Sequence, residues 1–167
     1  MKLHLLTVLL VVGFSSMTFL NCVSAQERQY HLGQEWVKIW IREDGTIDLF
    51  YNISITLVSG LDITRVYVGQ PNGDFTIGNA TDQNGYPLVV SDASSGTDYK
   101  VQVNLTSPLV AGHTIWFTVT TNVANMIYED NQTNVGMEFK PTWWKQASVL
   151  DLRVLIVLPL GVNASMV

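Results

Sequence analysis

The residues that could carry out chemistry are few and stand far apart. His31 and His113 are the only histidines after residue 25, and neither has a cysteine or a second histidine at a metal-ligand spacing. Glu129, Asp130 and Glu138 could supply paired carboxylates for glycoside cleavage, which needs two carboxyl groups roughly 5 to 10 Å apart. No Gly-x-Ser-x-Gly motif marks a nucleophile. We therefore predict a non-enzymatic protein with no catalytic residue, no cofactor and no metal.

Two short loops carry oxygen ligands next to a glycine. Asp82-Gln83-Asn84-Gly85 begins like a calcium loop, but the later carboxylate that completes such a loop is missing. An Asn-Gly hairpin turn accounts for the same residues. Asn72-Gly73-Asp74 has the same character, and we predict turns at both places.

Adjacent tryptophans, Trp143 and Trp144, are the most conspicuous aromatic feature. Neighbouring residues on a strand face opposite ways, so at most one of them can enter the core of a sandwich. Either the other lies under a loop, or it is exposed and contacts a sugar ring, a protein partner or a membrane interface. Trp40 and Phe50 form a second candidate patch for a partner or sugar.

Five triplets match the acceptor pattern for N-glycosylation, where composition alone predicts roughly two. The excess indicates a glycosylated protein, although a β protein rich in Asn and Thr also collects such triplets by composition. The candidate asparagines are Asn52, Asn79, Asn104, Asn131 and Asn163.

The first 25 residues have the pattern of a secretory signal peptide, with Lys2, an apolar run over 5–14 and small residues before Gln26. Cleavage after Ala25 removes Cys22, so no disulfide or thiolate metal site is expected. It also removes one of the 9 basic residues, leaving 14 acidic ones in clear excess. This acidity disfavours nucleic acid as a partner. We expect one domain over 26–167, located outside the cell or on its surface, with no membrane-spanning segment.

Apolar and polar residues alternate from residue 35 to 159, and Gly, Asn, Asp and Pro interrupt them at short intervals. This pattern predicts an all-β fold, an antiparallel β-sandwich of about nine strands that is immunoglobulin-like or jelly-roll-like. The first hairpin joins 36–42 to 46–57. A three-residue loop with Gly45 in the left-handed region sets Ile41 against Ile47 and gives one clean apolar face. Lys38, Trp40, Arg42, Asp48, Phe50 and Asn52 then point outward.

Further strands are predicted at 63–69, 75–78, 88–91, 99–106, 114–122, 135–139 and 149–158. The last of these has an apolar second half on both faces, which indicates a central strand covered on both sides. Alternatively, a neighbouring subunit covers it by strand addition, or the chain is the front of a longer protein.

Three segments carry a resemblance to a known group of proteins. They are Asp44-Gly45 before a long strand, the turn 107–112, and Pro141-Thr142-Trp143-Trp144 before 152–161. Together they resemble uncharacterised archaeal cell-surface β-sandwich proteins. The resemblance implies an extracellular location and a β-sandwich fold, and it says nothing about activity. We expect a secreted or cell-surface module for protein association or self-assembly through a strand edge or aromatic patch, with carbohydrate binding through exposed tryptophans as the alternative.

Overall fold

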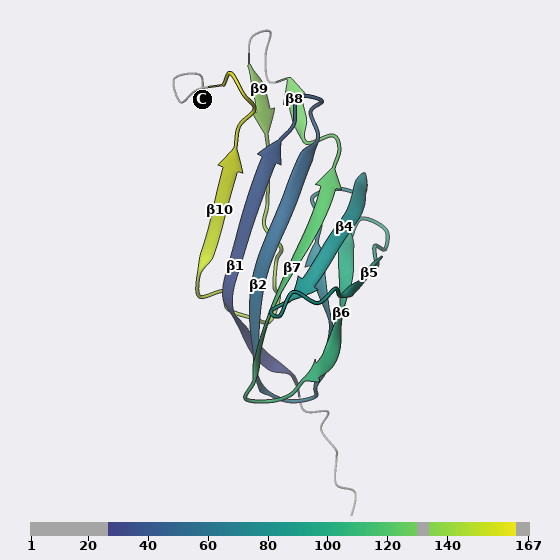
Figure 1. Cartoon of the computed structure of the whole chain (residues 1–167), viewed down its shortest axis with the longest axis vertical. Coiled ribbons are helices and arrows are strands. Elements are labelled where there is room, and N and C mark those ends of the chain that lie inside the picture. Colours follow the sequence, from purple (N-terminus) through teal and green to yellow (C-terminus); the bar gives the residue numbers. More distant parts are fainter. Residues whose placement is uncertain (1–26, 130–133, 163–167) are drawn as a thin grey trace, which may run out of the picture.

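The computed structural model describes residues 27–129 and 134–162 (Figure 1), which form strands and no helix. No helix in these ranges is therefore long and apolar enough to cross a membrane. The predicted signal peptide lies outside the described residues. The strands are β1 (Gln29–Ile41), β2 (Ile47–Ser59), β3 (Ile63–Gly69), β4 (Phe75–Asp82), β5 (Val89–Asp92), β6 (Lys100–Leu109), β7 (Thr114–Val123), β8 (Ile127–Glu129), β9 (Val135–Met137) and β10 (Leu152–Val157).

Two sheets make the body of the protein. The larger has the order β10-β1-β2-β7-β4 and the smaller the order β3-β6-β5, while β8 and β9 form a separate ribbon at one end. All pairs are antiparallel except β1 with β10. The prediction of an all-β, sandwich-like fold is confirmed, and the parallel pair is a departure from a purely antiparallel one.

The first hairpin has the predicted register. Ile41 pairs with Ile47, Ile39 with Leu49 and Val37 with Tyr51. Gly45 has a φ of +80°, the left-handed conformation that the three-residue loop requires and that glycine adopts without steric cost. Since the side-chain period of a strand is two, this register sends the aliphatic residues beside the loop and Tyr51 to one face, and Trp40 and Phe50 to the other.

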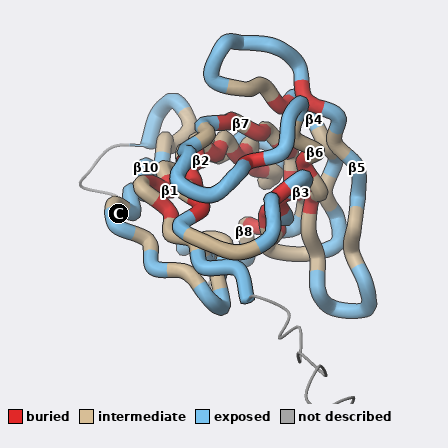
Figure 2. Tube along the Cα trace, turned by 90° about the horizontal axis from the view of Figure 1, so that it is seen from below, coloured by how far each residue is buried: buried red, intermediate tan, exposed pale blue. Residues whose placement is uncertain are grey.

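The core lies between the two sheets. Buried stretches of β1, β2 and β7 face buried stretches of β3 and β6, as Figure 2 shows along the chain trace. The fully buried side chains with the largest volumes come mostly from β1 and β2, which are also the two longest strands. The largest of them are Tyr51, Phe117, Leu32, Ile39, Ile47 and Leu49.

The remaining strands were predicted close to their observed bounds, with four main differences. β6 continues to Leu109 where the prediction ended at Thr106. β4 continues to Asp82 where the prediction ended at Gly78, and β10 is shorter than the predicted 149–158. The short strand β8 was not predicted, because three residues are too few to show a period.

Residues 138–151, here called the crossover segment, connect β9 to β10. The segment runs behind the larger sheet and brings the chain back so that β10 can lie parallel to β1 (Figure 1). Thr142 donates a hydrogen bond from Oγ1 to the carbonyl oxygen of Gly69 at 3.4 Å, which ties the segment to the end of β3. The crossover segment therefore lies beside the smaller sheet. There it covers the part of β1 that the smaller sheet is too narrow to cover.

The expectation that the last strand is central is wrong. β10 is at the edge of its sheet, and its only hydrogen-bonded neighbour among the described strands is β1. Its apolar residues are exposed on both faces, since neither the smaller sheet nor the crossover segment extends over them. The sequence pattern indicates which residues need cover, and the residues that the structure describes do not cover them.

Candidate functional site

Strand β10 is an apolar edge that is open to solvent. Leu152 is 53% exposed, Val154 43% and Leu155 55%, and Ile156 is exposed as well. Soluble proteins usually protect such edges with lysine, proline or a bulge. β10 contains none of these, and Arg153 is its one charged residue.

Among the residues that the structure describes, no strand pairs with the outer side of the β10 backbone. Just before the strand, Leu32 donates its N–H to the carbonyl of Ser148 and accepts from the N–H of Leu150, both at 2.9 Å. Glu35 donates to the carbonyl of Asp151 in the same way. In a parallel pair alternate residues bond to opposite sides, so Leu152, Val154 and Ile156 direct their N–H and C=O groups away from β1.

A small polar cluster holds β10 against β1 on the outer face of the sheet. Trp36 donates from Nε1 to Oδ2 of Asp151 at 2.9 Å, and the Arg153 guanidinium forms an ion pair with the same carboxylate. The guanidinium also lies over the Trp36 ring, 4.5 Å from its centroid. Hydrogen bonds from Arg153 and Trp36 lower the pKa of Asp151, so this carboxylate is charged at neutral pH.

The two adjacent tryptophans take different environments. Trp144 is half-buried against the core, whereas Trp143 is 84% exposed. The interpretation that places one in the core and the other under a loop is therefore wrong for Trp143. Both lie in the crossover segment, outside any strand, so the coil itself allows them to point in different directions.

Trp143 and Trp144 form one wall of a groove of about 510 Å³ beside β3. The other walls come from the start of β1, from β2 and from β3. We call it the basic aromatic groove, because basic and aromatic side chains dominate its lining and no carboxylate contributes. Its lining residues are Arg28, Tyr30, Ile55, Ile63, Arg65, Val66, Tyr67, Trp143, Trp144 and Lys145.

Behind Trp144 lies a buried carboxyl group that sequence reasoning did not single out. Glu35 is 1% exposed, and its Oε2 accepts a hydrogen bond from Nε1 of Trp144 at 2.9 Å. Burial raises the pKa of Glu35 to about 7, although the Trp144 bond opposes that rise. Tyr51 is a diagonal neighbour on the same inner face, and burial raises the pKa of its phenol too.

Glu35 and Tyr51 place polar atoms inside the core. Oε1 of Glu35 and the hydroxyl of Tyr51 are buried and have no partner of normal hydrogen-bond geometry among the described residues. Thr142 of the crossover segment is nevertheless close enough to both groups to oppose the rise in their pKa values. Neither side chain reaches solvent. We interpret the Glu35 carboxyl group as a structural support. It holds Trp144 in place, and Trp144 in turn forms part of the groove wall.

A β-bulge at Gly33 places Glu35 on the inner face. The register between β1 and β2 shifts between Leu32 and Gln34, so Leu32 and Glu35 are both buried although they are three positions apart. A Cβ atom on Gly33 would lie 2.6 Å from Oγ of Ser54, so only glycine allows this close approach.

The predicted aromatic patch of Trp40 and Phe50 is on the outer face of the larger sheet, as expected. Both side chains are half-buried and line a shallow hollow of about 560 Å³. The Lys38 ammonium lies over the Trp40 ring, 4.6 Å from its centroid. Trp40 is therefore already covered in part by a neighbour from its own strand.

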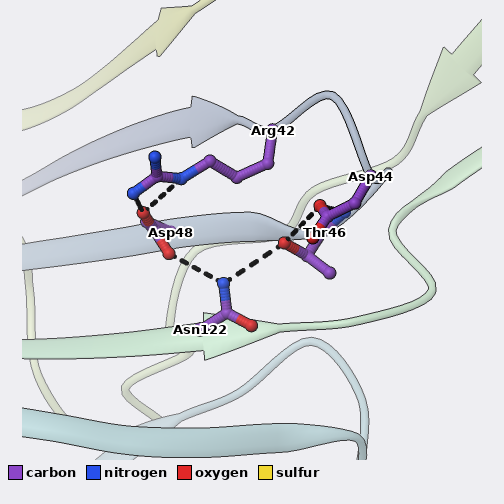
Figure 3. Close-up of polar contacts among 5 residues, drawn as sticks. All are labelled: Arg42, Asp44, Thr46, Asp48 and Asn122. Carbon is purple, nitrogen blue, oxygen red and sulfur yellow. Dashed lines mark hydrogen bonds and ion pairs between the residues drawn. The ribbon is translucent and has the colours of Figure 1, made fainter.

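A network of polar side chains holds the loop at the end of the first hairpin in its observed conformation (Figure 3). The Arg42 guanidinium pairs with the Asp48 carboxylate, and Asn122 donates to the other Asp48 oxygen at 2.7 Å. Asp44 accepts from the backbone N–H and the hydroxyl of Thr46, and the backbone bond is the main cause that lowers the Asp44 pKa. Because these polar groups are hydrogen-bond and ion-pair partners of one another, we assign the network a structural role in the turn.

The candidate glycosylation sites have different surroundings. Asn79 is exposed on edge strand β4 rather than beside a turn. Asn52 and Asn104 face outward as expected but are half-buried, and their Oδ1 atoms accept hydrogen bonds from Gln34 and Gln102. Asn131 and Asn163 lie outside the described residues.

The other polar candidates have structural partners. Oδ1 of Asp82 accepts from the backbone N–H of Asn84 at 2.8 Å and of Tyr86 at 2.9 Å, so the loop is the predicted turn. Oδ1 of Asn72 likewise accepts from the N–H of Asp74. Glu138 pairs with Lys140 at 2.9 Å, and Asp130 lies outside the described residues.

Comparisons with known proteins show the fold and nothing finer. No protein-family model matches the chain, and no curated protein matches it. A solved two-domain M1 zinc metallopeptidase variant bound to L-arginine is similar over 83% of this chain and 34% of that chain, with 14% identity and a TM-score of 0.54. An M1 zinc metallopeptidase from Deinococcus radiodurans gives 15% identity over 64% of this chain and 23% of that one, with a TM-score of 0.45. The chain thus spans between about a quarter and a third of the length of these solved chains. At such identities the similarity defines a class, an all-β sandwich-like domain, and no particular protein within it.

Proposed function

We propose that this chain is a non-enzymatic, secreted or cell-surface module that associates with further copies of itself by strand addition at β10. The supporting observation is the combination of an unpaired backbone edge with apolar side chains exposed on both faces of that strand. Strand addition uses both features, because the backbone provides hydrogen bonds and the side chains provide buried area. The signal-peptide pattern supports the location.

Substitutions in β10 separate edge pairing from general stability. Proline at Val154 removes an N–H that points away from β1, so pairing with β1 is retained while a partner strand loses a hydrogen bond and meets the ring. Threonine at Val154 is the matched control, since it keeps the N–H and the β-branched shape.

The measurement is the molar mass of the secreted full chain by light scattering over a range of concentrations. We expect wild type and Val154→Thr to exceed the monomer mass as concentration rises, and Val154→Pro to stay monomeric with an unchanged circular dichroism spectrum. A wild-type chain that remains monomeric at its highest soluble concentration would overturn self-association through β10.

A second candidate function is carbohydrate binding, supported by the exposure of Trp143 beside the groove. An exposed indole face stacks against the C–H groups of a sugar ring, and aromatic side chains line the groove on two sides. A glycan array with wild type and Trp143→Ala tests this function, and the absence of any bound glycan for wild type would reject it.

A further inference from the structure

The basic aromatic groove has a charge that the rest of the protein does not share. The whole chain has a net charge of −5 with histidine neutral, yet the groove is lined by Arg28, Arg65 and Lys145 and by no acidic side chain. Lysine and arginine side chains that gather on an acidic protein create a local positive potential. This potential favours ligands that carry negative charge.

Two of the three basic groups are free to bind such a ligand. Arg28 is engaged, because its Nε donates to the carbonyl of Leu61 at 2.9 Å and its guanidinium also donates to the carbonyl of Asp62 at 3.0 Å. Arg65 and Lys145 are exposed, and their side chains make no ion pair or hydrogen bond with any described residue. They approach the groove from opposite walls, β3 and the crossover segment.

The aromatic side chains define the shape of the ligand. Trp143 offers an exposed ring beside Lys145, and Tyr67 offers a ring two positions from Arg65 on β3. Trp144 is fixed in the wall by its bond to Glu35. A volume of about 510 Å³ is within the range of small-ligand sites, roughly 300 to 1,000 Å³. A ring that can lay one face against an indole and that carries an anion therefore matches both the stacking surfaces and the free cations.

We propose that the basic aromatic groove binds acidic sugars, with Trp143 stacking on the ring and Arg65 and Lys145 contacting the carboxylate. This inference rests on the second candidate function and adds the charge class of the ligand. Arginine contacts a carboxylate through two parallel N–H donors and lysine acts as a point charge, so the two residues contribute different geometry to the same anion.

The test is calorimetric titration of the full chain with an oligosaccharide of glucuronic acid and with its neutral glucose counterpart. We expect the acidic sugar to bind about tenfold more tightly, because two exposed ion pairs that each contribute roughly a factor of three together give about that preference. The double variant Arg65→Gln and Lys145→Gln should reduce binding of the acidic sugar to the level of the neutral one. Lys38→Gln, on the outer face of the larger sheet, is the matched control and should change neither.

Trp143→Ala should weaken both sugars, because stacking does not depend on charge. Equal binding of the two sugars by wild type, or a double variant that keeps the preference, would overturn the inference while leaving carbohydrate binding intact. Binding of neither sugar would overturn the inference together with the second candidate function, and would not affect association at β10. A polyglutamate peptide that binds as tightly as the acidic sugar and is insensitive to Trp143→Ala would show selection for charge alone and overturn the sugar assignment.

Discussion

The indole Nε1 of Trp144 donates a 2.9 Å hydrogen bond to Oε2 of Glu35, and this bond connects the wall of an exposed groove to the centre of the core. The two residues are far apart in the sequence and come from a strand and a coil. The buried carboxyl group thus adds a side-chain contact to the hydrogen bonds from Thr142 and Leu150 that also hold the coil. A buried polar group that keeps its partner is tolerated, and one that loses its partner is costly.

The ionisation of Glu35 should make the protein less stable as pH rises. The native pKa is about 7 and the ordinary value 4.5, so the native state binds this proton more tightly than the unfolded chain does. The stabilisation is complete below about pH 4.5 and is lost as pH rises through 7, by on the order of 3 kcal/mol. Glu35→Gln should remove this dependence, as measured by denaturant unfolding at several pH values. Glu138→Gln, at an exposed carboxylate, should retain it, and a wild-type stability that rises over this range would contradict the assignment.

The buried bond between Thr121 and Gln70 should contribute to stability through its hydroxyl group. Thr121 donates from Oγ1 to Oε1 of Gln70 at 2.8 Å, and both side chains are buried. Thr121→Val keeps the shape but leaves the Gln70 oxygen without a donor, which costs about 1 to 3 kcal/mol. Thr121→Ser keeps the hydroxyl and should cost less. Urea unfolding measures both variants, and a serine variant less stable than the valine variant would contradict this account.

A side chain at the Gly33 bulge should destabilise the protein while Ser54 is present. A Cβ atom there would lie 2.6 Å from Oγ of Ser54, so Gly33→Ala forces a local shift that costs about 1 to 3 kcal/mol. The penalty should shrink in a Ser54→Ala background, where the next atom is 3.9 Å away. A double-mutant cycle measured by thermal unfolding checks this, and additive effects would place the strain elsewhere.

The Asp151 carboxylate should determine how firmly β10 is held. Asp151→Ala removes the acceptor for Trp36 and the ion pair with Arg153. We expect amide hydrogen exchange in β10 to accelerate about tenfold, equivalent to a loss near 1.4 kcal/mol in local opening. Asp98→Ala breaks an exposed pair with Lys100 and serves as control. Unchanged exchange in β10 would show that backbone pairing alone holds the strand.

Local patterns predicted the register of the first hairpin around its loop, because that information is local. They did not predict the start of β1, which begins at Gln29 rather than at the predicted residue 36. Alternation identified the apolar face, and Gly45 fixed the loop, so the register followed from residues 36–57 alone. The same alternation places Glu35 in phase with Val37 and Ile39, which is the sequence feature that could have revealed the buried carboxyl group. Its partner Trp144 lies in a coil, where the sequence has no apolar periodicity from which the direction of a side chain could be predicted.

The position of β10 could not be predicted from its own residues. A strand that is apolar on both faces requires cover, and the pattern is the same whether cover comes from this chain or from another molecule. The groove was missed for a related reason. Arg28, Arg65 and Lys145 are distant in the sequence, and only the return of the crossover segment brings the last of them beside β3.

The parallel pair also has a consequence for the order of folding. Glu35 pairs with Leu152, and nearly the whole domain separates them along the chain. Contacts of such large sequence separation form slowly, because a long loop must close before the pair gains any stability. The edge of β1 therefore stays vacant while the earlier strands assemble. During that interval the edge of β1 is accessible to the β10 segment of another molecule. Local protein concentration at the time of folding therefore determines whether β10 pairs with β1 of its own molecule or is exchanged between copies.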